Sequence, residues 1–287
     1  MKFIIEVFTH FFKSDTFQKG ASLAYYAVFS FIPTLILIIS VFGLLYGEQA
    51  VNGDLYKQLQ TNFGTEGANQ IEQIIKNHHT NYNSWLTGIL GFAGLLLNAS
   101  VLIREIRYCL NSIWNVKKKE KSGIWDYINK HLSSIVLLIG LFVVIFASTI
   151  VSSFIAKHDQ FFHIDFQFAY IYEHLVSFVV MSFLFSLMFK FLGDAKINWR
   201  ATISGGIFTG ILFIFGKTAI SNYVAHSHVS STFGNASLLA LVMLWVYYTS
   251  QIIFLGASFI TIISERMGHE IVPKSDAVEI KIVEINQ

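Results

Sequence analysis

One stretch decides the fold: Ser237-Leu-Leu-Ala-Leu-Val-Met-Leu-Trp-Val-Tyr-Tyr-Thr-Ser-Gln-Ile-Ile-Phe-Leu-Gly-Ala-Ser-Phe-Ile-Thr-Ile-Ile263. It belongs to a longer run, from Thr218 to Ser264, that contains no Asp, Glu, Lys or Arg. As an α-helix its 27 residues would extend about 40 Å, which exceeds the ~30 Å hydrocarbon core of a bilayer. A soluble helix of this length would carry a charged face, and this stretch has none. The sequence therefore predicts a membrane-spanning helix.

The composition of the whole chain agrees with this interpretation. Hydrophobic residues make up 54% of the sequence and charged residues 13%, whereas a typical soluble domain carries about 25% charged residues. We therefore expect an all-α integral membrane bundle of six transmembrane helices, with an external helical loop between the first two spans. The single cysteine, Cys109, excludes an internal disulfide.

Apolar runs separated by polar segments predict the bounds of the six spans. They cover about residues 20–47, 85–108, 132–156, 168–192, 201–222 and 237–263. Pro33 is expected to kink the first span, because proline removes a backbone hydrogen-bond donor. Gly206-x-x-x-Gly210 in the fifth span is a candidate face for close helix packing.

Two polar segments flank the spans. Residues 1–19 are predicted to form a cytoplasmic interfacial helix, with Phe3, Val7 and Phe11 on one face. Residues 265–287 are predicted to form a cytoplasmic tail, which is either disordered or contains a short strand that begins at Val278.

The distribution of basic residues orients the spans. Sixteen of the 20 Lys and Arg residues fall on the side of the two termini, three fall on the other side, and Lys217 lies within a span. Loops on the cytoplasmic side of a membrane carry the excess of Lys and Arg. Both termini are therefore predicted to be cytoplasmic.

Two ionisable residues, Glu173 and Lys217, lie within predicted spans, where such residues are costly and often functional. Each is 17 positions from a basic residue at the cytoplasmic end of its span, Lys190 and Arg200 respectively. The two side chains are therefore expected at one height, roughly 25 Å from that end. Lys217 then meets an anionic head group in a cleft, or it forms a structural ion pair with Glu173, or it extends to the outer head groups.

Other polar side chains in the spans are candidates for contact with a substrate. Arg104 and Arg107 share a helix face at the inner end of the second span, where they either bind a phosphate-bearing lipid or simply anchor the helix. Asn98 lies near mid-membrane and suits either a hydrogen bond between helices or a substrate contact.

Aromatic residues supply the remaining candidates. Tyr25 and Tyr26 precede Pro33 in the first span, and they either line a cavity or belong to an aromatic belt. Deeper in the sixth span lie Trp245, Tyr247 and Tyr248, where a belt is a poor explanation, so at least one of them is expected to face the interior of the bundle, and Trp245 is the candidate for lining a substrate path.

Sequence motifs of catalysis are missing. The chain has no His-Glu-x-x-His, no Cys-x-x-Cys, no Gly-x-Ser-x-Gly and no phosphate-binding glycine-rich loop. We therefore predict no catalytic residues, no metal, no cofactor and no nucleic-acid partner. Membrane lipids with anionic head groups are the expected partners, and a homo-oligomer is left open.

Several segments become informative when they are taken together. In chain order they are Gly20-Ala-Ser-Leu-Ala-Tyr-Tyr-Ala-Val-Phe-Ser-Phe-Ile-Pro33, Cys109-Leu-Asn-Ser-Ile-Trp-Asn115, Asn198-Trp-Arg-Ala201, Ser231-Thr-Phe-Gly234, Leu244-Trp-Val-Tyr247 and Leu255-Gly-Ala257. This series resembles the YihY/BrkB family of bacterial inner-membrane proteins, some of which are labelled ribonuclease BN. The family pattern has Tyr and Glu where this chain has Phe233 and Ser258.

The resemblance implies a multi-pass protein of the bacterial plasma (inner) membrane with cytoplasmic termini, and some members look linked to the export of envelope lipids. Our first hypothesis is a transporter or flippase-like handler of an anionic amphipathic envelope substrate. The alternative is a non-catalytic membrane scaffold for envelope biogenesis. Ribonuclease activity is not expected, because the sequence shows no soluble catalytic domain and no set of metal ligands.

Overall fold

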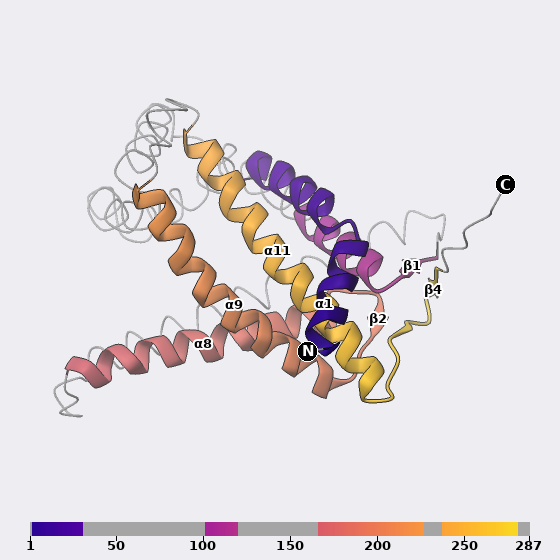
Figure 1. The fold of residues 1–287 in the computed structure, drawn as a ribbon. Helices are drawn as coiled ribbons and strands as arrows, with labels where there is room; N and C mark the ends of the chain where they lie inside the picture. Colours follow the sequence, from indigo (N-terminus) through magenta and orange to yellow (C-terminus); the bar gives the residue numbers. More distant parts are fainter. Residues whose placement is uncertain (1, 31–100, 120–165, 227–236, 281–287) are drawn as a thin grey trace, which may run out of the picture. The chain divides into compact units, whose positions relative to one another are not determined.

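The structure, a computed structural model, describes residues 2–30, 101–119, 166–226 and 237–280. The described chain is mostly helical, as predicted (Figure 1). Its contacts divide it into two compact units. The first unit contains residues 1–16, 106–214 and 251–287, and the second contains residues 17–105 and 215–250.

Three long helices occupy the ranges predicted for the last three spans. They are α8 (Phe166–Phe191), α9 (Trp199–His226) and α11 (Ser237–Arg266). Within the described residues, two stretches are long and apolar enough to cross a membrane, Trp199–Ile220 and Leu239–Arg266. Residues 16–30 and 101–113 are also helical and belong to the first two predicted spans. The third predicted span and the external loop lie outside the described residues.

In the first unit, α9 packs against α8 on one face and against α11 on another. A Cβ atom at Gly206 would collide with the Ser186 hydroxyl and the Ser182 carbonyl of α8. One residue earlier, a Cβ atom at Gly205 would collide with Ile260 of α11. The predicted close-packing face is therefore confirmed at Gly206, because only glycine lets the two backbones approach so closely.

Apolar side chains form rows on the exposed faces of α8 and α9. Leu175, Val179 and Phe183 are exposed on α8 at intervals of four residues. An equivalent stripe on α9 consists of Ile203, Ile207 and Ile211. Four-residue spacing places such side chains on one side of a helix. Large apolar side chains in such rows are typical of a surface that faces lipid rather than water.

Trp114 lies at the centre of the core of the first unit. Its Nε1–H donates a 3.3 Å hydrogen bond to the carbonyl oxygen of Ala257 in α11, and its ring meets that of Phe189 in α8 edge to face. Cys109, which lies one to two helical turns before Trp114 in the chain, is fully buried as well. Residues far apart in the sequence therefore meet at the end of helix 101–113.

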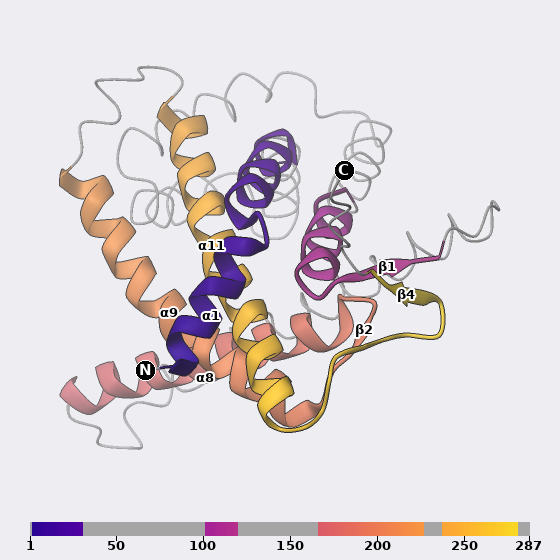
Figure 2. The same cartoon turned by 45° about the vertical axis from the view of Figure 1, so that its right-hand side comes forward.

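Four short strands hold the segment that follows α11. Strand β1 (Val116–Lys118) pairs antiparallel with β4 (Ala277–Glu279), and β2 (Ala195–Lys196) pairs with β3 (Val272–Pro273). Figures 1 and 2 show the chain leaving α11 and running back to lie beside β1. These strands are only two or three residues long, so the described part of the chain remains mostly helical, as predicted. Of the two predicted states of the tail, the short strand is the one found, and it begins at Ala277.

The amino-terminal segment is not one helix over residues 1–19. Helix α1 (Lys2–Lys13) ends at a turn in which Asp15 adopts a φ of 50°, and a second helix begins at residue 16. The predicted face of α1 is buried at Val7 and Phe11, and the ring of Phe3 lies 5.3 Å from that of Phe259 in α11. This face packs on protein.

Two close contacts lie within the second unit. Ser22 in helix 16–30 donates a 2.6 Å hydrogen bond through its hydroxyl to Oε1 of Glu105. A Cβ atom at Gly216 of α9 would collide with the Tyr248 ring of α11. Pro33 lies outside the described residues, so its predicted kink stays a prediction.

Candidate functional site

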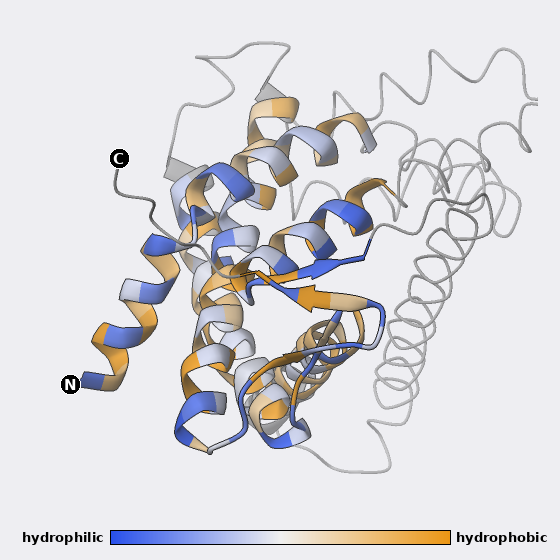
Figure 3. Ribbon diagram, turned by 90° about the vertical axis from the view of Figure 1, so that its right-hand side faces the viewer, coloured by the Kyte–Doolittle hydropathy of each residue, from blue (hydrophilic) through white to orange (hydrophobic). Residues whose placement is uncertain are grey.

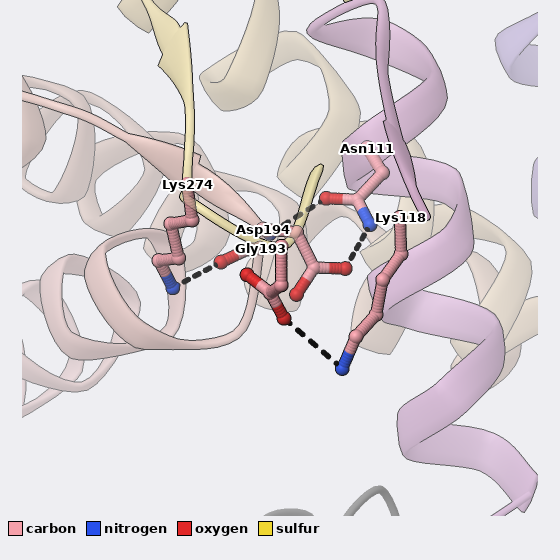
Figure 4. Close-up of polar contacts among 6 residues, drawn as sticks. Asn111, Lys118, Gly193, Asp194 and Lys274 are labelled. Carbon is pink, nitrogen blue, oxygen red and sulfur yellow. Dashed lines mark hydrogen bonds and ion pairs between the residues drawn. The ribbon is translucent and has the colours of Figure 1, made fainter. Parts of the chain in front are cut away.

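A polar network joins three segments of the first unit at the end of helix 101–113. We call it the tail clamp, and its members are Asn111, Lys118, Gly193, Asp194, Lys274 and Asp276 (Figure 4). It connects helix 101–113 and β1 with the α8–α9 turn and with the segment after α11.

The buried centre of the tail clamp is the pair Asn111 and Asp194. The side-chain Nδ2 of Asn111 donates to Oδ2 of Asp194 at 2.7 Å, and the backbone N–H of Asp194 donates to Oδ1 of Asn111 at 2.8 Å. A buried amide and carboxylate lose water on folding, and these reciprocal bonds replace it. The pair therefore fixes the α8–α9 turn against helix 101–113.

The segment after α11 closes the tail clamp. Lys274 donates through Nζ to the Gly193 carbonyl at 2.6 Å and through its backbone N–H to the Asp194 carbonyl at 2.8 Å. The Lys118 ammonium lies 3.3 Å from the Asp276 carboxylate, and both side chains are partly exposed. The contacts of Lys274 hold the tail more firmly, because they are the more deeply buried of the two sets.

Arg107 and Lys190 lie within electrostatic range of Lys274, and we call these three residues the basic cluster. Burial lowers the pKa of Lys274, the carboxylates of Asp194 and Asp276 oppose this change, and the positive charges of Arg107 and Lys190 add to it. Lys190 donates to the Ile197 carbonyl and lies 5.0 Å over the Trp199 ring. The lowered pKa therefore reflects chiefly the burial of the ammonium.

Asp276 lies at the edge of the tail clamp, and the influences on its pKa oppose one another. Partial burial alone would raise the pKa of Asp276, but the hydrogen bond from Lys118 and the positive charges of Lys118 and Lys274 outweigh it, so the pKa lies below its ordinary value. Asp276 is therefore ionised at neutral pH, and it offsets part of the positive charge.

The predicted phosphate-binding residues are now placed. Arg104 and Arg107 lie three positions apart in helix 101–113, and both are partly buried. Arg107 joins the first unit and the basic cluster, whereas Arg104 belongs to the second unit. Their roles in binding an anion stay predictions.

The predicted intramembrane residues are placed in part. Lys217 is exposed on α9. Glu173 belongs to α8, but its side chain lies outside the described part of the structure, so the predicted pairing with Lys217 stays a prediction. Asn98 lies outside the described residues altogether.

The predicted aromatic residues belong to the second unit. The rings of Tyr25 and Tyr26 lie 5.7 Å apart, and both side chains are exposed. The ring of Tyr25 also meets that of Phe29, at 4.8 Å. Trp245 is partly buried in α11, so it is neither fully enclosed nor free of protein.

Sequence reasoning missed most of the tail clamp. Asn111 stands in a segment that was quoted only for its resemblance, and Asp194 falls between the fourth and fifth predicted spans. The two lie 83 positions apart, so no local spacing could reveal their contact. Only the structure shows that Gly193, beside Asp194, has no room for a side chain next to Trp114. Among the described residues, no three His, Cys, Asp or Glu side chains come together to hold a metal ion.

Comparison with known proteins identifies the family of this chain. Residues 7–281 match the family described as virulence factor BrkB. The chain belongs to the BrkB family. The resemblance seen in the sequence is thereby confirmed, and the segments that carried it include core residues of the first unit, among them Leu110, Trp114 and Ala257.

Curated relatives carry the name UPF0761 membrane protein. One from Glaesserella parasuis serovar 5 is 25% identical over 222 residues, which is 76% of this chain and 75% of that protein. One from Teredinibacter turnerae is 24% identical over 270 residues, 93% of this chain and 61% of that protein. One from Histophilus somni is 22% identical over 270 residues, 92% of this chain and 91% of that protein. No solved structure matches the chain.

These comparisons establish a membrane protein of the BrkB family. A membrane location explains why α8 and α9 expose rows of apolar side chains. The names of the relatives state no substrate and no reaction.

Proposed function

We propose that this protein binds an anionic amphipathic envelope lipid and moves its head group across the plasma membrane, without a chemical step. The observation that carries the proposal is the basic cluster of Arg107, Lys190 and Lys274, which brings two further cations within electrostatic range of a partly buried ammonium whose pKa is lowered by burial. A phosphate group would stabilise the charged forms of these side chains, because each of its oxygens accepts charge-assisted hydrogen bonds.

The geometry of the basic cluster suits a head group. An ammonium has three donor hydrogens, so the bond from Lys274 to the Gly193 carbonyl leaves it capacity for phosphate oxygens. The planar guanidinium of Arg107 can offer two parallel N–H groups to one phosphate. A lipid that is held there would keep its acyl chains beside the apolar rows of the helices.

Lys217 is the second place at which the proposed lipid head group would meet a positive charge. It is exposed on α9 within the stretch that is apolar enough to cross a membrane. A lysine in such a position is costly unless it reaches head groups or an anionic ligand. The sequence hypothesis alone assigns four further residues to the path of the lipid: Arg104, Tyr25, Tyr26 and Trp245.

The test is lipid flipping by the purified protein in vesicles that contain a fluorescent phosphatidylglycerol. Arg107→Ala and Lys217→Ala should each slow flipping by about tenfold or more, the equivalent of one charge-assisted hydrogen bond. Arg107→Lys keeps the charge and should retain most of the rate. Lys196→Ala, which removes an exposed lysine from the same α8–α9 turn, is the matched control.

Two outcomes would reject the proposal. One is an unchanged rate in Arg107→Ala and Lys217→Ala, and the other is a wild-type rate no higher than that of protein-free vesicles. Either result would favour the alternative of a non-catalytic scaffold. Native mass spectrometry of the detergent-released protein would then distinguish the two, because a scaffold should carry only bulk lipid.

A further inference from the structure

Helix α1 has two apolar faces, one buried against protein and one exposed. Phe3, Val7 and Phe11 form the packed face, which contacts α11. The guanidinium of Arg266 lies 4.7 Å from the centre of the Phe3 ring. This face accounts for about half of the apolar residues of α1.

The other apolar face is exposed. Ile4, Ile5, Phe8 and Phe12 have relative exposures between 44% and 62%. At 100° per residue they continue the packed face around the helix rather than lying opposite to it. The rings of Phe8 and Phe12 stack on each other at 6.4 Å, so they form one surface. Four large apolar side chains on a helix this short are not typical of a surface in contact with water.

The polar side of α1 is positively charged. Lys2, Thr9 and Lys13 are exposed on that side. Glu6 supplies the only carboxylate of α1, and its Oε2 is bonded to Arg266 at 2.7 Å. The charges of α1 that remain available to a partner are therefore the two lysines. In Figure 3, α1 beside the N label shows both its hydrophilic and its hydrophobic residues.

We infer that α1 lies along the lipid–water interface, with Ile4, Ile5, Phe8 and Phe12 inserted among acyl chains and with Lys2 and Lys13 at anionic head groups. The occupant of the exposed face is the bilayer, because a broad apolar arc bounded by lysines complements an anionic lipid surface. This assigns the membrane to a different face from the one that the sequence predicted. Contacts from Phe3 and Glu6 then connect the membrane surface to the end of α11.

Single-cysteine labelling tests this inference in the full-length protein. Cys109 is fully buried, so a thiol-reactive NBD dye should report on an introduced cysteine alone, with the wild-type chain as the blank. Ile4→Cys places the dye on the exposed apolar face, and Thr9→Cys, about 140° away around the same helix, places it on the polar side as the control. Each labelled protein is reconstituted in nanodiscs that contain a lipid with a nitroxide on its acyl chain.

The expected result is an asymmetry between the two positions. The nitroxide should reduce NBD fluorescence about twofold or more at position 4 and much less at position 9, as for a helix half immersed in the acyl region. Quenching at position 4 should be stronger in phosphatidylglycerol than in phosphatidylcholine, and Lys2→Gln with Lys13→Gln should remove that difference.

Three outcomes would overturn the inference. Equal quenching at positions 4 and 9 would show that lipid contacts neither face preferentially. A dye at position 4 that is shielded from water but not quenched would show that protein, for example a second copy of the chain, covers the face. Equal quenching in the two lipids would reject the anionic surface. None of these outcomes depends on lipid transport, so the inference stands apart from the proposed function.

Discussion

Asn111 and Asp194 hold the α8–α9 turn against helix 101–113 through two reciprocal hydrogen bonds, of 2.7 and 2.8 Å, between residues 83 positions apart. Both side chains are buried, so neither can exchange its partner for water. The pair is therefore the point at which a small change should have a large effect on the first unit.

We predict that Asp194→Ala lowers the free energy of unfolding by about 1–3 kcal/mol, because it leaves the amide of Asn111 buried and unpaired. Asp194→Asn retains a side-chain oxygen as acceptor and should cost less. Chemical unfolding in detergent measures both, with Lys196→Ala as a control in the same turn. Equal losses from the alanine and asparagine variants would contradict this account.

The packing of α9 on α8 gives a second prediction. Gly206→Val places a side chain where Ser182 and Ser186 leave no space, and it should destabilise the protein by about 1–3 kcal/mol or prevent accumulation. Ile207→Val, at the adjacent exposed position, should change stability by less than about 0.5 kcal/mol. Thermal unfolding in detergent measures the difference, and similar melting temperatures for both variants would refute the close approach.

Patterns that depend on neighbouring residues were predicted well. The ranges of α8, α9 and α11 follow from uninterrupted apolar runs, because the length and polarity of a spanning helix are set by the bilayer. The face of Gly206 was also predicted, since small residues four apart stand on one side of a helix. The packed face of α1 follows from the same periodicity.

Contacts between distant segments were not predictable. The bond from Lys274 to Gly193 spans 81 positions, and it depends on how the segment after α11 returns to the α8–α9 turn. The strands that guide this return are only two or three residues long, too short to produce an alternating pattern. The second apolar face of α1 was missed for another reason: periodicity identifies apolar faces but not which of them meets protein.

The tail should be held chiefly by Lys274. Lys274→Met keeps the apolar stem but leaves the Gly193 carbonyl without its donor, which should cost about 1–2 kcal/mol. Asp276→Asn should cost less than about 1 kcal/mol at neutral pH, since its pair with Lys118 is partly exposed. Because the pKa of Asp276 is lowered in the folded state, even that contribution is lost as the pH falls through the lowered pKa. Limited proteolysis of residues 269–280 by a protease of broad specificity should accelerate in Lys274→Met and stay unchanged in Asp276→Asn.

Acid should loosen α1. Burial lowers the pKa of His10 below 6.5, and no hydrogen-bond partner for its Nδ1 is found among the described residues. Between the lowered pKa and 6.5 the unfolded state holds more protons than the folded state, so stability rises with pH through that window. Hydrogen exchange in α1, corrected for its intrinsic rate, should be faster at pH 5 than at pH 8. His10→Asn, which stays neutral, should remove the dependence, and a pH-independent wild type would exclude this role.

The orientation of the chain gives the last prediction. Sixteen of the 20 Lys and Arg residues place both termini in the cytoplasm, with the loop between the first two spans outside. On intact cells, a membrane-impermeant maleimide should therefore label Asn52→Cys at once and Ser275→Cys only after the membrane is opened. Ser275 is exposed in the structure, so a failure to label it in intact cells would reflect the membrane and not burial. The wild-type chain supplies the blank because Cys109 is buried. Labelling of Ser275→Cys in intact cells would reverse the orientation, and the basic cluster beside it would then face the outside.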